Sequence, residues 1–397
     1  MMSQRLFPPA LAFLTLIWLG SPTLAHSSEQ TQTPTAKLAA SDWQSLRDKN
    51  ILEWTPEEQR NGYPNIRQIN PTREIPASDH PWPLPEDLWT NTQDWEAQMA
   101  ELHLAGLLVI QGGKVRFEQY RLGHTADERW MSFSIAKSVV SLLYGIAMKE
   151  RHIESLDETV ATYLPRFEGT GYANVTIKDL LRMASGVQWN EDYEDPNSDV
   201  AALDDASENE VLEHLASLPS LHPPGSVFNY NTGETILAGA ILSKAVGMSL
   251  SEYLQSRLWQ PFGMGANADW ALMGPEGAEM GGCCISATLR DYGRLGLFAL
   301  NSGKTQSNES LLPQDWMLEA TQPSPAADYY GYFWWLTGDG DYRASGIFGQ
   351  GIHISPSHDL VVAMHGLWPE AIDQDFSRKR TELIGAIKRA LNQSASD

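Results

Sequence analysis

Strand-like segments occur in two separate parts of this chain, and this arrangement constrains the fold more than any other feature. The first part comprises residues 104–110, which are almost wholly apolar, a Gly-Gly turn at 112–113, and residues 115–120. Helical periodicity dominates from about 155 to 300. Strand-like sequence returns only near the C-terminus, at 332–336, 342–344, 351–355 and 360–365, before a final amphipathic helix at 372–391.

These segments predict an α+β fold rather than a doubly wound parallel sheet, because the strands within each part are linked as hairpins. We expect both parts to complete one antiparallel sheet flanked by helices. A helical subdomain at about 155–300 would lie beside the sheet, and an active-site cleft is expected at the junction between them.

The composition indicates a soluble globular protein. At 397 residues with 42% hydrophobic residues, the chain can form one large or two ordinary domains with a sizeable core. Its formal net charge of −22 would repel nucleic acid and anionic membrane surfaces, so neither is expected as a partner. The sequence indicates no cofactor and no metal site, and no heptad pattern predicts an oligomeric state.

The N-terminus has the three-part pattern of a secretory signal peptide: Arg5, an apolar run at 11–19, and small residues ending at Ala25. We therefore expect residues 1–25 to be cleaved near Ala25, and the mature protein to be periplasmic or extracellular. No later stretch could span a bilayer. Residues 26–100 are polar without sustained periodicity, and are predicted to form an irregular lead-in to the main domain at 101–397.

Ser134 and Lys137 lie three residues apart at the start of an apolar run that predicts a helix over 139–148. Positions i and i+3 share a helix face, so the lysine amine would lie over the serine hydroxyl. A partly buried lysine loses its proton more easily and can activate that hydroxyl as a nucleophile. A Ser-x-x-Lys spacing also arises by chance, so this prediction depends on the residues that accompany it.

Two further segments supply what acyl transfer needs, a proton shuttle and a strand that aligns the substrate. Tyr230 follows a Pro-Gly turn and precedes a predicted helix at 236–246, so its phenol could reach into a cleft. Glycines inside strand-like sequence at 343–351 are typical of close backbone approach, although ordinary turns or bulges explain them equally well.

Residues 190–210 contain nine acidic side chains and no basic one. We interpret this segment as a solvated surface loop; the alternative is a lid that favours cationic or amine-bearing substrates. The only two cysteines, Cys283 and Cys284, are adjacent and cannot join distant segments, so the core must stabilise the fold. Two small buried thiols are expected there, and a vicinal disulfide is the alternative.

Motifs spread over about 104–370 resemble those of the serine β-lactamase and penicillin-recognising family, in its class C-like branch of esterases and 6-aminohexanoate-dimer hydrolases. Ser134-Ile-Ala-Lys137 matches that family's nucleophile motif, and Phe228-Asn-Tyr-Asn231 matches its tyrosine motif. Further matches are Ile153-Glu-Ser-Leu-Asp157, Thr176-Ile-Lys-Asp-Leu-Leu181, Trp259-Gln-Pro-Phe-Gly-Met264 and Ser286-Ala-Thr-Leu-Arg-Asp291. The resemblance implies the β-lactamase and transpeptidase fold, with its antiparallel sheet and helical subdomain.

The resemblance also implies roles for individual residues. Ser134 would be the acylated nucleophile, with Lys137 and Tyr230 sharing the base and acid roles. Backbone N–H groups of Ser134 and of a residue near Ile347 would form the oxyanion hole, and Tyr193 would contact the substrate. The same motifs give a further set of substrate-binding candidates: Asn231, Gly346, Gly349 and Gln350.

Two departures from the family pattern bear on the substrate. Lactamases of the family usually have Tyr-x-Asn, whereas Thr232 occupies the third position here. Their edge strand carries Lys-Thr-Gly, whose lysine contributes to binding the substrate carboxylate, whereas Ala344-Ser345-Gly346 lacks a lysine. Arg343 is adjacent, but side chains alternate along a strand, so it can point away.

We therefore expect an exported serine hydrolase that cleaves a small ester or amide through an acyl-enzyme on Ser134. One alternative is a β-lactamase or a peptidoglycan D,D-peptidase, which would need a cation that binds the substrate carboxylate. The other is a catalytically silent protein that binds a cell-wall fragment or a partner, although the intact Ser134, Lys137 and Tyr230 argue against it.

Overall fold

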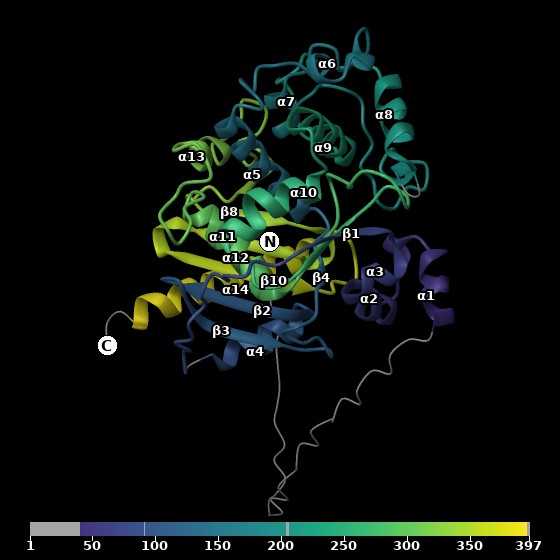
Figure 1. The fold of residues 1–397 in the computed structure, drawn as a ribbon. Helices are drawn as coiled ribbons and strands as arrows, with labels where there is room; N and C mark the ends of the chain where they lie inside the picture. The colour runs from purple at the N-terminus through teal and green to yellow at the C-terminus, as the bar shows by residue number, and fades with distance from the viewer. Residues whose placement is uncertain (1–39, 91, 204–205, 395–397) are drawn as a thin grey trace, which may run out of the picture. The chain divides into compact units, whose positions relative to one another are not determined.

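The computed structural model describes residues 40–90, 92–203 and 206–394 (Figure 1). The predicted signal peptide, residues 1–25, lies outside this range. Within the described residues, no helix combines the length and the apolar character that crossing a bilayer requires.

A six-stranded antiparallel sheet organises the described chain. Its strands follow the order β3-β2-β10-β9-β8-β7. Their bounds are β2 (Leu104–Gln111), β3 (Lys114–Tyr120), β7 (Trp335–Leu336), β8 (Tyr342–Ser345), β9 (Gly351–Ser355) and β10 (Leu360–Gly366). Strands β2 and β10, from the two distant parts of the chain, pair antiparallel with Leu108 opposite Ala363. The predicted α+β fold, with an antiparallel sheet flanked by helices, is confirmed.

Helices cover both faces of this sheet, because strand β2 is apolar on both sides. Leu108 and Ile110 of β2 share one apolar core with α12 (Leu289–Leu300). Leu107 and Val109 alternate with them and therefore point to the other face, where they pack with α4 (Gln93–Glu101) and α14 (Gln374–Ser394).

The helical part of the chain, whose helices are labelled in Figure 1, shares the apolar core of α12 according to its buried side chains. It contains α5 (Ile135–Glu150), α6 (Val160–Tyr163), α7 (Ile177–Leu181), α8 (Glu208–Ser217), α9 (Thr232–Val246), α10 (Leu250–Leu254), α11 (Gln260–Phe262) and α13 (Trp316–Ala320). The predicted subdomain boundary near residue 300 needs a correction, because α12 packs directly on strands β2, β9 and β10. The sequence of α12 has the same helical periodicity as the segments before it, so periodicity alone does not show that α12 packs on the sheet.

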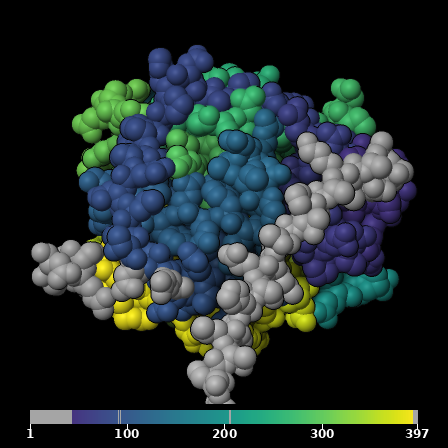
Figure 2. All heavy atoms as spheres, turned by 90° about the horizontal axis from the view of Figure 1, so that it is seen from below, coloured from purple at the N-terminus to yellow at the C-terminus, as the bar shows by residue number. Residues whose placement is uncertain are grey.

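The predicted irregular lead-in also needs a correction. From residue 40 it contains α1 (Ala40–Arg47), α2 (Pro56–Gly62), α3 (Ile66–Ile69) and β1 (Thr72–Ile75) as well as α4. Strand β1 belongs to a second sheet, of order β1-β5-β6-β4, with β4 (Trp130–Met131), β5 (Ala268–Ala271) and β6 (Ile285–Ala287). Figure 2 shows this N-terminal segment, in purple, packed against the rest of the described chain. These elements are short and depend on distant partners, so the sequence pattern does not reveal them.

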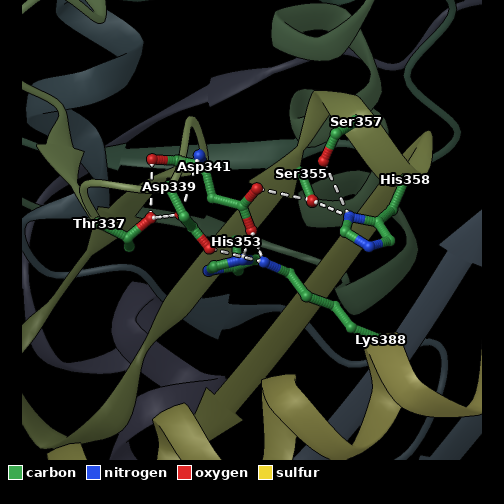
Figure 3. Close-up of polar contacts among 8 residues, drawn as sticks. All are labelled: Thr337, Asp339, Asp341, His353, Ser355, Ser357, His358 and Lys388. Carbon is green, nitrogen blue, oxygen red and sulfur yellow. Dashed lines mark hydrogen bonds and ion pairs between the residues drawn. The ribbon is translucent and has the colours of Figure 1, made fainter.

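A cluster of polar side chains, centred on the buried Asp341, attaches α14 to the sheet (Figure 3). Lys388 of α14 forms ion pairs with Asp339 and Asp341, the residues just before β8. Asp341 also lies 2.7 Å from His353 Nε2 and accepts a hydrogen bond of 2.6 Å from Ser355 Oγ. Burial alone would raise the pKa of Asp341, but the hydrogen bonds from His353, Lys388 and Ser355 hold it below its ordinary value. The cluster therefore fixes α14 on strands β8 and β9.

Candidate active site

Ser134, Lys137 and Tyr230 meet at the start of α5. Lys137 Nζ lies 3.1 Å from Ser134 Oγ, within hydrogen-bonding distance. The same Nζ is 5.3 Å from the centroid of the Tyr230 ring, and the Tyr230 hydroxyl forms a hydrogen bond with Ser134. Ser134 is the N-cap residue of α5, yet its side chain makes no capping hydrogen bond. Its hydroxyl is therefore available for chemistry.

Lys137 is buried, and its burial makes the loss of its proton easier than in an exposed lysine. Burial lowers the pKa of Lys137 to about 8, and the negative charge of Glu191 acts in the opposite direction. Its Nζ also donates a hydrogen bond of 2.9 Å to the carbonyl of Gly282. A Cβ on residue 282 would lie 3.2 Å from Lys137 Nζ and 2.4 Å from Thr235 Oγ1, so only glycine fits there.

The residues after Gly282 correct a second prediction. Cys283 and Cys284 are joined by a vicinal disulfide, whereas two free thiols were the expected arrangement. Adjacent cysteines are compatible with free thiols and with a disulfide, so the sequence did not decide between them. The disulfide follows directly on the residue whose carbonyl contacts Lys137.

Tyr230 holds its proton more strongly than an ordinary tyrosine. Burial raises the pKa of Tyr230, the charge of Glu191 raises it further, and the hydrogen bond to Ser134 acts in the opposite direction. Over the pH range in which Lys137 loses its proton, Tyr230 therefore remains protonated. The two side chains can divide the work, with Lys137 as base and Tyr230 as acid.

The expected oxyanion donors, the N–H groups of Ser134 and Ile347, each lie next to a residue with unusual backbone geometry. Phe133 has φ 46° and Phe348 has φ 58°, both in the left-handed region that non-glycine residues rarely adopt. Within the described residues, neither N–H donates to a main-chain carbonyl or a side chain. Both groups are therefore free to bind an oxyanion.

Aromatic packing holds these two phenylalanines in place. Their ring centroids are 5.4 Å apart. Tyr63 of the N-terminal segment packs edge-on against Phe133 at 5.2 Å and in a tilted arrangement against Phe348 at 6.2 Å. Tyr63 is fully buried. The segment expected to be irregular thus packs directly against the residues that flank Ser134 and Ile347.

Gly346 and Ile347 line a pocket of about 350 Å³ together with Ser134 and Tyr230, which we call the active-site pocket. Tyr193, for which the resemblance implies a contact with the substrate, also lines this pocket. Four of its lining side chains are aromatic: Tyr193, Tyr230, Trp335 and Trp368. Such a surface suits an apolar acyl group.

Three of the predicted substrate-binding residues lie outside the pocket lining. Gln350 is fully buried, and its amide bonds to Trp130 Nε1, to the carbonyl of Phe348 and to both backbone groups of Gly366. Asn231 is also buried and caps α9 by accepting a hydrogen bond from the backbone N–H of Glu234. Gly349 lies against Trp368, where a Cβ would come within 2.4 Å of Nε1. These residues support the site without facing a ligand.

Glu191 and Arg380 also line the pocket, although the sequence analysis did not select them as site residues. Glu191 belongs to an acidic run whose members look alike in the sequence. Arg380 resembles any basic residue of an amphipathic surface helix. Arg343, expected to be able to point away, lines the pocket as well.

A protein-family model described as Beta-lactamase matches residues 92–366 of this chain. The chain belongs to the β-lactamase family. Its sequence is similar to the 6-aminohexanoate-dimer hydrolase of Paenarthrobacter ureafaciens, with 25% identity over 83% of this chain and 91% of that protein. The family resemblance inferred from the motifs is confirmed.

Solved structures share the β-lactamase fold of this chain. One, from Bacillus anthracis, is of a candidate 6-aminohexanoate-dimer hydrolase, with 22% identity, a TM-score of 0.79, and coverage of 88% of this chain and 98% of that chain. A family VIII carboxylesterase has 15% identity and a TM-score of 0.58, covering 73% of this chain and 94% of that chain. The chain is thus a β-lactamase-family hydrolase whose fold these solved structures share.

Proposed function

We propose that this protein hydrolyses small esters or amides with apolar acyl groups through an acyl-enzyme on Ser134. The observation that carries the proposal is the 3.1 Å contact between Ser134 Oγ and a buried lysine whose pKa is lowered to about 8. A lysine in this state can accept the serine proton at neutral to mildly alkaline pH. The similarity to a 6-aminohexanoate-dimer hydrolase supports amides among the substrates.

In the proposed mechanism, Lys137 takes the proton of Ser134 as Oγ attacks the substrate carbonyl. The N–H groups of Ser134 and Ile347 bind the negative oxygen of the tetrahedral intermediate. When the intermediate collapses, Tyr230 gives its proton to the leaving amine or alcohol and regains one from the Lys137 ammonium. A water molecule then attacks the ester on Ser134, and the same pair handles its proton, releasing the acid and restoring the serine.

Replacing Ser134 tests this proposal. Purified protein from residue 26 onward is incubated with a butanoyl nitrophenyl ester, an aliphatic amide and nitrocefin. Ester or amide turnover should vanish in Ser134→Ala, and intact-mass measurement should detect an acyl adduct on the wild type only. Ser141→Ala is the matched control, because Ser141 lies on the same helix and its buried hydroxyl has no hydrogen-bond partner. Turnover that persists in Ser134→Ala would refute the mechanism.

Nitrocefin turnover in the same assay separates the alternative functions. We expect it to be slow relative to ester turnover, because the edge strand lacks the lysine of Lys-Thr-Gly. Fast, Ser134-dependent nitrocefin hydrolysis would favour a β-lactamase. A protein that binds without turning over any of the three probes would favour the silent alternative.

We further propose that the protein is exported after cleavage near Ala25. The signal-peptide pattern supports this, and so does the Cys283–Cys284 disulfide, because disulfides persist in oxidising compartments. N-terminal sequencing of the protein from the periplasm or the medium should begin at His26. Recovery of the full-length chain from the cytosol alone would contradict export.

A further inference from the structure

We propose that the Cys283–Cys284 disulfide positions Lys137 for catalysis, so that reducing the pair to two thiols slows the reaction. This inference rests on the proposed hydrolase function and adds a redox dependence to it. The link between the disulfide and the active site is Gly282, the residue just before the pair. Its carbonyl accepts a hydrogen bond of 2.9 Å from Lys137 Nζ.

Two hydrogen bonds define the position of the Lys137 amine. Nζ lies 3.1 Å from Ser134 Oγ, which it deprotonates in the proposed mechanism, and 2.9 Å from the Gly282 oxygen. During turnover the serine oxygen becomes bonded to the substrate, so it cannot serve as a fixed anchor. The Gly282 carbonyl is therefore the partner that holds the amine in place. A shift of this carbonyl would displace the base, and misplacing a catalytic group by about 1 Å can cost about a hundredfold in rate.

The backbone that carries this carbonyl is weakly restrained on its N-terminal side. Gly281 precedes Gly282, and neither position has room for a side chain. A Cβ at residue 281 would lie 2.4 Å from the carbonyl oxygen of Thr235, and one at residue 282 would lie 2.4 Å from Thr235 Oγ1. Glycine permits this close approach, but it also gives the backbone more conformational freedom than any other residue does. Another feature must therefore fix the Gly282 carbonyl.

On the C-terminal side, the chain is attached to the segment that carries the nucleophile. Strand β6 begins at Ile285 and pairs with β4, and the N–H of Ser132 donates a hydrogen bond of 2.8 Å to the Ile285 carbonyl. Only Cys283 and Cys284 separate this fixed point from Gly282. A disulfide between neighbours closes a small ring through their peptide bond and so restricts rotation of the backbone. The disulfide thus extends the fixed position of β6 to the Gly282 carbonyl.

The pair can be reduced and reoxidised by thiol exchange. Cys283 is partly exposed and Cys284 is buried, so a thiolate of a dithiol reductant reaches the sulfur of Cys283 first. Its attack forms a mixed disulfide with Cys283 and releases Cys284 as a thiolate, which takes up a proton. The second thiol of the reductant then displaces Cys283. Two electrons and two protons pass to the protein, and the dithiol becomes a disulfide.

The redox state of the pair would couple activity to the compartment. Thiols stay reduced in the cytosol, whereas disulfides persist in exported proteins. The enzyme would therefore be slow before export and reach its full rate after oxidation. This agrees with the signal-peptide pattern at the N-terminus.

Reduction of the purified protein tests the inference, because Cys283 and Cys284 are the only cysteines of the chain. Protein from residue 26 onward is treated with dithiothreitol and desalted under argon. Alkylation followed by intact-mass measurement verifies that both thiols are free. We then measure kcat and KM for a nitrophenyl ester on the plateau of the pH profile above the Lys137 pKa of about 8, where a small change in that pKa scarcely alters the rate.

We expect reduction to lower kcat about tenfold or more and to leave KM within about twofold, because Lys137 moves a proton in the transition state. Reoxidation with diamide, which takes up the two electrons, should restore kcat. The double variant Cys283→Ser with Cys284→Ser is the matched control. It should have the kcat of the reduced protein, and dithiothreitol should not change it. The Tm should fall only slightly, because the disulfide closes a very short loop.

Three results would overturn the positioning role. The first is an unchanged kcat in protein whose thiols are both free, and the second is a double variant with the kcat of the oxidised wild type. The third is a loss of kcat that accompanies unfolding in circular dichroism, which would make the disulfide a structural element only. If the untreated protein shows no Ser134-dependent turnover, the hydrolase proposal fails and this inference fails with it. Ser134-dependent turnover that ignores the redox state overturns the positioning role alone.

Discussion

The replacement Glu191→Gln should make the enzyme more active at neutral pH. Glu191 raises the pKa of Lys137 through its negative charge, which keeps the lysine protonated and unable to act as a base. Glutamine has nearly the same shape. Its oxygen can face the N–H donors of Trp189 and Thr232, while its amide group faces the hydroxyls of Tyr193 and Thr232, which can turn to accept.

The magnitude follows from the neutral fraction of Lys137. With a pKa of about 8, roughly 9% of the lysine is neutral at pH 7 and roughly 91% at pH 9, so kcat/KM of the wild type should rise about tenfold between them. Removing a nearby charge shifts the pKa of a buried group such as the Lys137 amine by on the order of one unit. The neutral fraction at pH 7 would then reach about one half, a gain of about fivefold, while activity at pH 9 would scarcely change.

The assay is kcat/KM for a nitrophenyl ester from pH 6 to 9.5 in buffers of constant ionic strength. The rising limb should have its midpoint near pH 8 in the wild type and at lower pH in Glu191→Gln. Tyr230 does not interfere, because its pKa is raised and it stays protonated throughout. If the midpoint of this rising limb is unchanged in Glu191→Gln, or lies at higher pH, Lys137 is not a base whose pKa Glu191 raises.

Two further predictions concern residues that support the site. Tyr63→Ala should lower the free energy of unfolding, measured in urea, by about 3–5 kcal/mol and reduce kcat, because Phe133 and Phe348 lose their packing partner. Tyr63→Phe is the control. It should leave stability and kcat nearly unchanged, since the buried hydroxyl of Tyr63 has no hydrogen-bond partner. Burial raises the pKa of Glu234 to about 8, so the unfolded chain ionises first and stability is lost as pH rises from about 4.5 to 8. Glu234→Gln should therefore remove about 3–4 kcal/mol of the stability difference between pH 5 and pH 8 in urea titrations, and identical pH dependence in both proteins would contradict this.

The main sheet could be predicted from the sequence because its strands are strongly apolar and are bounded by turns. The predicted starts of β2, β8, β9 and β10 coincide with the observed ones. Strands β1, β4, β5 and β6 could not be predicted, since they are only two to four residues long and pair with distant segments. The local pattern of apolar and polar residues does not indicate which distant segments will pair.

The site was predictable to the extent that its chemistry lies in local motifs. Ser134, Lys137 and Tyr230 each belong to a short recognisable segment, and the fold brings them together. Asn231 and Gln350 belong to equally recognisable segments, but their amides bond within the protein. Arg380 could not be found from sequence, because its position in the pocket depends on how α14 packs against the sheet.

The pairing of β2 with β10 has a consequence for biogenesis. Ser134 is synthesised in the first half of the chain, but β2 lacks its neighbour β10 until residues 360–366 leave the ribosome. Until then an apolar strand has an open edge, and α14, which covers one of its faces, does not yet exist. Pairing strands so far apart in the sequence is slow, and an unpaired apolar edge is prone to aggregation in the meantime. The main sheet, and the pocket whose lining includes residues of β8 and α14, therefore form only when the C-terminal part of the chain has been synthesised.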